Sequence, residues 1–324
     1  MSESSSTLAK VSRLGLACGV CAAVLYTAAN ICLRQVVHVD PVWVSAIKAI
    51  PTFLMVAPLV FLRYWRGQVL WSTRSDILWL IVTGFCAQIF GNVAFQWSLS
   101  ILGLAISVPM ILGAMLVGGA LIGRVVLGEP VRPRTLLAVV LLIVAAVILT
   151  RGAQSSVSNQ PDVQVWQIVL AVCGNMAAGI AYAFLGTMMR RSMQAGMPMI
   201  STLFVLSVVG TGLLGTWALF TVGVPGMLAT AGVDFAIMFA GGAFNALAFL
   251  LLAKALQQLP VLYVQLLNAT QAGMAAIAGW LIFGEQLSPM VQLGLALTAA
   301  GLIIAGTRST RPKLMRPAAK RLKP

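Results

Sequence analysis

The sequence predicts an all-α polytopic membrane protein, with ten transmembrane helices arranged as two inverted repeats of five helices each. Three observations lead to this prediction: an apolar composition, ten apolar runs of spanning length, and an internal repeat. Hydrophobic residues make up 60% of the chain and charged residues 9%, and the mean hydropathy is +0.98. A soluble domain carries about 25% charged residues. The composition therefore excludes an ordinary water-soluble protein.

Ten apolar runs are long enough to cross a bilayer as helices, which takes about 20 residues each. A helix is required because a spanning segment must satisfy its own backbone hydrogen bonds. The first run follows Lys10 and Arg13 as a signal peptide would, but it has a repeat partner, so we expect it to be retained. The runs lie near residues 14–36, 42–62, 77–98, 103–125, 134–151, 166–189, 200–222, 233–257, 260–283 and 288–307.

The ten runs form two copies of one unit, at 14–151 and 166–307, followed by a basic tail at 308–324. Gly128-Glu129 in the first copy recurs as Gly284-Glu285 in the second, and every run and break falls on its counterpart. A unit of five helices is odd, so the second copy enters the membrane the opposite way up. Inverted repeats of this kind place a substrate site near the membrane midplane in secondary transporters.

The net charge is +14, and most of the basic residues fall in segments on one side of the predicted membrane. With the N-terminus in the cytoplasm, ten alternating helices leave only Arg34, Lys48 and Arg151 outside or facing outward. This positive-inside pattern predicts that both termini are cytoplasmic, and short loops without a transit peptide indicate the cell inner (plasma) membrane. The basic tail is expected to contact anionic lipid headgroups. A partner-binding patch is the alternative, and no nucleic-acid partner is expected.

Two motifs carry a family resemblance. The second half reads A-L-Q-Q-L-P at 255–260 and G-W-L-I-F-G-E-Q at 279–286, and the first half contains G-E-P-V-R-P at 128–133. These segments resemble the EamA-type unit of the drug/metabolite transporter superfamily, over about residues 14–307. The chain therefore resembles the members of this superfamily that have ten helices and two EamA units.

This resemblance implies a central cavity lined by the first, third and fourth helices of each half. It implies transport of small solutes such as amino acids, sugar phosphates, nucleotide sugars, purines or drugs. Glu129 and Glu285 belong to the family motif and sit at helix ends. Their favoured role is to tether the following loop, and proton coupling is the alternative.

Polar side chains in the expected cavity helices are the candidate substrate-binding residues. In the third run, one face carries three amides at intervals of four residues. Tyr26 and Tyr182 are equivalent in the two repeats and are placed to contact a substrate from both sides. The alternative role for the amides is to join helices by hydrogen bonds. The candidates are Tyr26, Asn30, Gln88, Asn92, Gln96, Asn175, Tyr182, Asn245, Gln265, Asn268 and Gln271, together with Lys48.

Lys48 is the charged residue that lies most firmly inside a predicted span, about 9 Å from the outer end of its helix. Its side chain either extends to the outer surface or contacts an anionic solute. No Asp or Glu lies in the first run or near the centre of a predicted span. Small multidrug relatives use a carboxylate in the first helix for proton-coupled export of cations, so the resemblance argues against that mechanism here. A site with amides, tyrosines and a lysine favours neutral, zwitterionic or anionic solutes.

These features predict a secondary transporter that moves small polar metabolites, amino acids or related compounds, by alternating access in the export direction. Alternative solutes are anionic sugar phosphates, nucleotide-type compounds or drugs. An intramembrane enzyme would need a nucleophile or metal site with acid–base partners; we expect no catalytic residue, cofactor or metal. A structural membrane protein would leave the stripe in the third run unexplained. Both halves lie in one chain, so a monomer is expected, with a dimer as the alternative.

Overall fold

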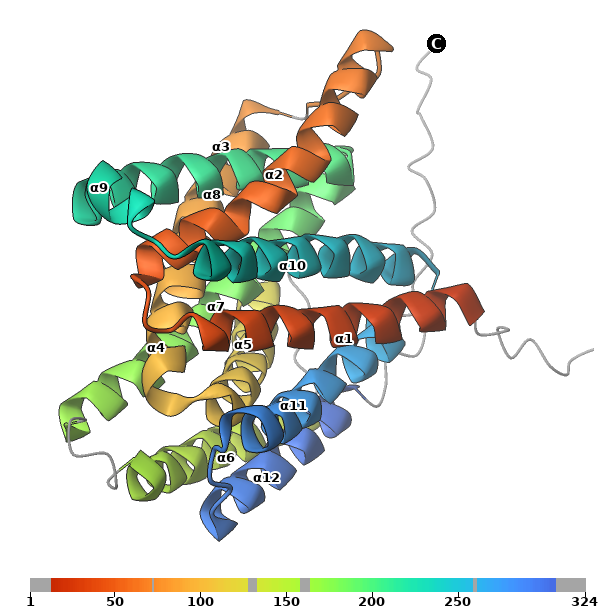
Figure 1. The fold of residues 1–324 in the computed structure, drawn as a ribbon. Coiled ribbons are helices and arrows are strands. Elements are labelled where there is room, and N and C mark those ends of the chain that lie inside the picture. The colour runs from red at the N-terminus through yellow and green to blue at the C-terminus, as the bar shows by residue number, and fades with distance from the viewer. Residues whose placement is uncertain (1–12, 72, 128–132, 158–163, 259–260, 307–324) are drawn as a thin grey trace, which may run out of the picture.

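A computed structural model describes residues 13–71, 73–127, 133–157, 164–258 and 261–306. All regular secondary structure in these residues is helical (Figure 1). In chain order the helices are α1 (Arg13–Gln35), α2 (Pro41–Trp65), α3 (Arg74–Cys86), η1 (Ala87–Val93), α4 (Ala94–Leu102), α5 (Leu104–Leu127), α6 (Pro133–Val157), α7 (Val165–Gln194), α8 (Met199–Thr221), α9 (Gly223–Leu228), α10 (Gly232–Gln258), α11 (Val261–Phe283) and α12 (Pro289–Gly306).

Local sequence signals set several helix ends. Asp40 caps α2, because its carboxylate accepts hydrogen bonds from the backbone N–H groups of Val42 (2.9 Å) and Trp43 (3.0 Å). Pro41 occupies the first turn of α2, where its missing N–H costs nothing. Gly103 separates α4 from α5 with φ +76°, a conformation that favours glycine. These signals place the ends of α1, α2, α4 and α5 close to the expected breaks.

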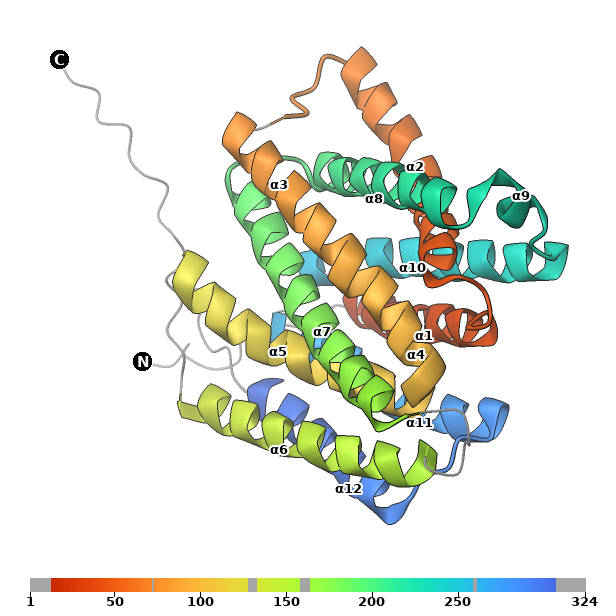
Figure 2. The ribbon, with the colours of Figure 1, turned by 90° about the vertical axis from the view of Figure 1, so that its left-hand side faces the viewer.

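The third helix of the chain contains a π-helical turn. α3, η1 and α4 form one continuous helix from Arg74 to Leu102, and η1 is the π-helical part between Ala87 and Val93. Figure 2 shows this long helix beside α7. A π turn inserts an extra residue into the helical repeat, so it rotates the residues that follow relative to those before it. Such turns occur frequently at functional sites.

The helices form a multi-pass membrane protein. Seven of them are long and apolar enough to cross a bilayer, and three shorter apolar helices lie at Leu136–Gly152, Thr270–Phe283 and Pro289–Ile304. Large apolar side chains are exposed on the surface, for example Val125 (84%) and Phe220 (86%). Exposed apolar side chains of this size and number suit lipid rather than water. The expected all-helical membrane class is confirmed, and the count of ten spans stays a prediction.

The helices are paired across the two halves of the chain. α1 lies beside α10, and α7 lies beside η1 and α4 (Figures 1 and 2). α2 packs on α8, and α6 packs on α12. In the repeat, α1 corresponds to α7, α2 to α8, the continuous helix α3–η1–α4 to α10, α5 to α11, and α6 to α12. Exchanging the two halves therefore turns the α1–α10 pair into the α7–α4 pair, and it leaves the α2–α8 and α6–α12 pairs unchanged. The packing therefore has the form that a two-fold relation between the halves produces.

One end of the bundle, which we call the Glu285 end, is where α1 and α11 finish and where α2, α5 and α10 begin. Polar contacts tie these segments together there: Arg34 to Glu285, His38 to Asp234, and Trp43 to Thr230, each at 3.0 Å. A buried apolar core lies directly beneath them and is built from α1, α2, α4, α5, α7, α10 and α11; its members include Leu33, Val44, Leu99, Leu104 and Met238. This end is therefore closed by both polar and apolar contacts.

The opposite end, which we call the Arg63 end, is where α2 finishes and α3 begins. Val56 of α2, Leu80 of α3, Met189 of α7 and Leu203 of α8 share one buried cluster there, so α7 also finishes at this end. α1 and α7 therefore run in opposite directions. The described basic residues at or near this end are Arg13, Arg63, Arg66, Arg74, Arg124, Arg190, Arg191 and Lys254. The tail at 308–324 and Glu129 lie outside the described residues.

Candidate functional site

Asn92 is the centre of a polar cluster made by three helical segments. The Nζ of Lys48, on α2, donates a hydrogen bond to Asn92 Oδ1 at 2.8 Å. The hydroxyl of Tyr182, on α7, donates to the same oxygen at 2.9 Å and lies 3.0 Å from the carbonyl oxygen of Gly91. Asn92 Nδ2 in turn donates to Gln88 Oε1 at 2.6 Å. Four of the predicted site residues therefore meet at one point, which we call the Asn92 cluster.

Glycines on the surrounding helices make room for this cluster. A Cβ added to Gly91 would lie 2.9 Å from the ring of Tyr182, and one added to Gly210 of α8 would lie 2.6 Å from Gln88 Nε2. A Cβ on Gly242 of α10 would lie 2.5 Å from the carbonyl oxygen of Lys48. Real Cβ atoms do not approach this closely, because the overlap is strongly repulsive. A larger residue at Gly91 or Gly210 would therefore displace Tyr182 or Gln88, and one at Gly242 would push against the backbone of Lys48.

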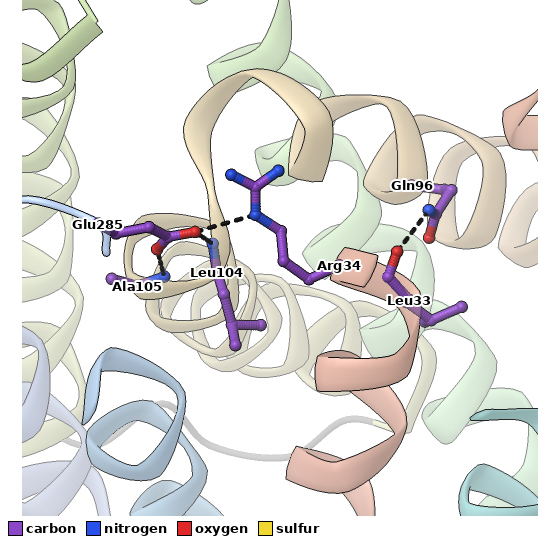
Figure 3. A network of polar contacts seen from close by, with 6 residues as sticks. All are labelled: Leu33, Arg34, Gln96, Leu104, Ala105 and Glu285. Atoms are coloured by element: carbon purple, nitrogen blue, oxygen red, sulfur yellow. Dashed lines mark hydrogen bonds and ion pairs between the residues drawn. The ribbon is translucent and has the colours of Figure 1, made fainter. Parts of the chain in front are cut away.

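The three amides of the third run do not form one hydrogen-bonded group. Gln88 and Asn92 lie in η1 and belong to the Asn92 cluster, whereas Gln96 lies in α4, beyond the π turn. Gln96 is 2% exposed, and its Nε2 donates to the carbonyl oxygen of Leu33 at 2.9 Å (Figure 3). The structure thus assigns Gln96 to a contact between α4 and α1, which was the alternative role for these amides.

Tyr26 and Asn30 on α1 and Asn245 on α10 are half-buried. Their side chains make no hydrogen bond with the other residues that the structure describes. Tyr26 lies close enough to Tyr182 for the two phenols to interact electrostatically. Tyr26 therefore lies near Tyr182 of the Asn92 cluster, and within the described residues all three side chains have polar atoms that are available to a solute or water.

The remaining amides lie elsewhere in the packing. Asn175 on α7 is fully buried, and neither amide atom has a partner within the described parts of the chain. On α11, Gln271 is buried and donates to Asn268, one turn earlier. The side chain of Gln265 lies outside the described residues. The structure does not bring Asn175, Asn268 or Gln271 into the Asn92 cluster.

Arg34 and Glu285 form a second polar site, at the Glu285 end (Figure 3). Besides its ion pair with Arg34, the Glu285 carboxylate accepts hydrogen bonds from the backbone N–H groups of Leu104 (2.7 Å) and Ala105 (2.8 Å). It thus caps the first turn of α5, where N–H groups lack helical partners and the helix dipole favours a negative charge. The guanidinium of Arg34 also lies 5.7 Å from the ring centre of Phe283.

Arg34 was not among the predicted site residues. The signal that could have identified it is the repeat, because Arg34 and Glu285 each have an equivalent of the same type, Arg190 and Glu129, at an offset of 156 residues. The favoured role of Glu285 was to tether the loop that follows it. The structure shows a wider contact, since its carboxylate joins α1, α5 and the end of α11.

Comparisons with known proteins agree with this architecture. The model of the EamA-like transporter family matches residues 13–151 and 168–307. A search of curated proteins finds no match. One solved structure, described only as the crystal structure of a protein, is 16% identical with a TM-score of 0.61, over 90% of this chain and 95% of the other. That likeness concerns the fold alone.

The two matched segments cover most of the chain and correspond to the two units that the sequence predicted. The resemblance to EamA-type members of the drug/metabolite transporter superfamily is therefore confirmed. The chain belongs to the EamA-like transporter family, and with its apolar helices it is a multi-pass membrane transporter of small solutes.

Proposed function

We propose that this protein is a secondary transporter that moves small polar metabolites, amino acids or related compounds, across the inner membrane by alternating access. The observation that carries the proposal is the Asn92 cluster, in which Lys48, Gln88 and Tyr182 converge on one amide inside an apolar bundle. Polar groups are costly at such a depth and typically serve a solute pathway. Tyr26, Asn30 and Asn245 complete the proposed site.

Helix direction and pairing support an inverted repeat of ten spans. α1 and α7 begin the two family units and run in opposite directions, and the cross-half pairs exchange as a two-fold axis requires. The seven long apolar helices and the three shorter ones together supply ten segments. In transporters built this way, one set of helices rocks against the other around a site at their interface.

The charge distribution supports an orientation with the Arg63 end in the cytoplasm, because basic residues gather on the cytoplasmic side of membrane proteins. The Glu285 end then faces outward, and both chain termini are cytoplasmic. The Arg34–Glu285 pair and the core beneath it support a conformation in which access from outside is blocked. Export requires this barrier to open after the solute has bound from the cytoplasmic side.

The carboxylates that the structure describes are all engaged at helix ends: Asp40, Asp76, Asp234 and Glu285. None of these four contacts the Asn92 cluster, which supports exchange or facilitated diffusion rather than proton coupling through the site. A proton-coupled mechanism through Glu285 is the alternative, since this residue connects three helices at the closed end.

The test is solute flux in proteoliposomes that contain the full-length protein. Vesicles loaded with labelled amino acids are compared with and without a pH gradient, in both the efflux and uptake directions. Asn92→Ala removes the shared acceptor of Lys48 and Tyr182, so we expect flux to fall about tenfold, the scale of a lost charge-assisted hydrogen bond. Gln292→Ala is the matched control, because Gln292 is an exposed amide whose side chain bonds the Leu287 carbonyl and no other residue among those described.

Flux without a gradient that falls in Asn92→Ala and persists in Gln292→Ala would support the proposal. Flux that follows the pH gradient would contradict the uncoupled mechanism and direct attention to Glu285. If all the amino acids tested stay inside the vesicles, the assignment to amino acids is wrong, and sugar phosphates, nucleotide-type solutes and drugs become the next candidates.

A further inference from the structure

We propose that Lys48 is an anion-binding residue and that the transported solute carries a single carboxylate, which Lys48 and Tyr182 bind together. The inference rests on the proposed transport function and specifies its solute class. It starts from one geometric fact: two donors from different helices, Lys48 Nζ and Tyr182 Oη, point at the same oxygen of Asn92, at 2.8 and 2.9 Å.

The side chain of Lys48 points into the bundle and not toward the Glu285 end. Lys48 lies seven residues into α2 from Pro41, about 10 Å from that end of the helix. Its ammonium group meets Asn92, which lies ten residues before Leu102, about 15 Å from the same end of its own helix. A lysine that reaches for the membrane surface would extend the other way. The ammonium is therefore held in the interior.

Lys48 has no counter-ion among the residues that the structure describes. Each described carboxylate has another partner at a helix end, and among the described residues Lys48 Nζ bonds the neutral amide of Asn92, which in turn contacts Gln88 and Tyr182. A charge taken out of water without a partner carries a large desolvation penalty. A charge is retained inside a membrane protein where a solute pathway uses it. A bound anion would supply the missing negative charge.

The donor geometry indicates how the anion binds. An ammonium group has three N–H donors, and within the described residues Lys48 uses one of them, on Asn92. A carboxylate beside Asn92 Oδ1 would accept a hydrogen bond from a free N–H of Lys48, and the single O–H of Tyr182 would turn from Asn92 to the carboxylate. Asn92 and Gln88 then offer amide groups to the rest of the solute.

The number of charges selects among anions. Among the described residues, Lys48 is the one cation that contacts the Asn92 cluster. Arg34 is not available to the solute, because it is paired with Glu285. One ammonium balances one carboxylate, whereas a phosphate monoester or nucleotide brings about two negative charges. Cationic drugs would be repelled by Lys48. The site therefore favours monocarboxylates, including the carboxylate of an amino acid, over sugar phosphates, nucleotides and cations.

The test uses the full-length protein in liposomes loaded with a ¹³C-labelled extract of small cellular metabolites. Released metabolites are identified by mass spectrometry and sorted by charge. We expect release of monocarboxylates and retention of phosphorylated and cationic compounds. Lys48→Met is expected to reduce the release of carboxylates at least about tenfold. Lys48→Arg is expected to restore part of it, and Lys254→Met, at an exposed lysine near the Arg63 end, to leave it unchanged.

A second variant tests the inference independently, in case Lys48→Met fails to fold. Asn92→Asp places a carboxylate next to the Lys48 ammonium, so the protein supplies its own counter-ion and the solute must compete with it. We expect Asn92→Asp to keep or raise the Tm of the purified protein while carboxylate release falls as it does in Lys48→Met. Wild-type carboxylate release by both variants would overturn the inference.

The outcomes separate the inference from the transport function. Release of solutes that lack a carboxylate as fast as carboxylates would overturn the anion site and leave the transporter intact. No release above protein-free liposomes, for any metabolite in the extract, would overturn the proposed transport function and the inference with it.

Discussion

Arg34 and Glu285 are separated by 251 residues in the sequence, and their side chains form an ion pair of 3.0 Å at the closed end of the bundle. The pair joins the last turn of α1 to the residues that follow α11. Because the same carboxylate caps α5, breaking it would release three segments at once. We interpret this pair as the main polar contact that holds the helices together at the Glu285 end.

Replacing Glu285 by alanine is expected to destabilise the protein by about 2–4 kcal/mol. It removes the cap of α5, which contributes about 1 kcal/mol, and leaves the largely buried guanidinium of Arg34 without a partner. The measurement is the Tm in detergent by scanning fluorimetry. His38→Ala is the control, because the exposed His38–Asp234 pair should contribute less than about 1 kcal/mol. Equal effects of the two changes would contradict this interpretation.

The role of Tyr182 is tested by removing only its hydroxyl. Tyr182→Phe loses the bonds to Asn92 and Gly91, so we expect a loss of about 1 kcal/mol in stability and a clear fall in solute flux. Tyr26→Phe is the matched change, since Tyr26 makes no such bond with the described residues. Its stability should stay near that of the wild type. A fall in stability without any fall in flux for Tyr182→Phe would assign this residue to packing alone.

Because α10 approaches the backbone of Lys48 closely at Gly242, adding one methyl group at Gly242 should lower both stability and flux. Gly242→Ala would place a Cβ 2.5 Å from the Lys48 carbonyl oxygen, and because that neighbour is backbone, α2 and α10 must separate. We expect a cost of about 1–3 kcal/mol and reduced flux. Gly215→Ala on α8 meets no atom within 4 Å, so it should be neutral or slightly stabilising. Melting temperatures and flux of the two alanine variants are compared directly.

The proposed orientation predicts which loops react from outside the cell. In a cysteine-free background, a membrane-impermeant maleimide should label Gln286→Cys on intact cells, because Gln286 is exposed at the Glu285 end. Gln68→Cys is exposed at the Arg63 end and should react only after the membrane is permeabilised. The reverse pattern would show that the Arg63 end faces outward and that the positive-inside argument fails for this chain.

Much of the architecture could be predicted because its causes are visible along the chain. The composition and the apolar runs indicate a helical membrane protein, and the constant offset between Glu129 and Glu285 indicates two units. Four candidates, Lys48, Gln88, Asn92 and Tyr182, do meet in one cluster. Polar residues are rare in apolar spans, so position alone marks them.

The details of the site depend on contacts that no local pattern reports. The interval of four residues placed Gln96 with Gln88 and Asn92, but the π turn at Ala87–Val93 separates it from them and turns it to Leu33. Spacing along an ideal helix assumes regular winding, and a π turn changes that winding.

The sequence by itself determined the membrane class, the family and the two units, because hydropathy, repeat spacing and motif are properties of the chain read in order. The tertiary structure alone decided that Arg34 pairs with Glu285 and that the Lys48 ammonium lies at Asn92 and Tyr182. The physical reason is that these contacts cross between helices. Which side chains meet depends on helix rotation and on close approaches at residues such as Gly91 and Gly242, and both are set by packing.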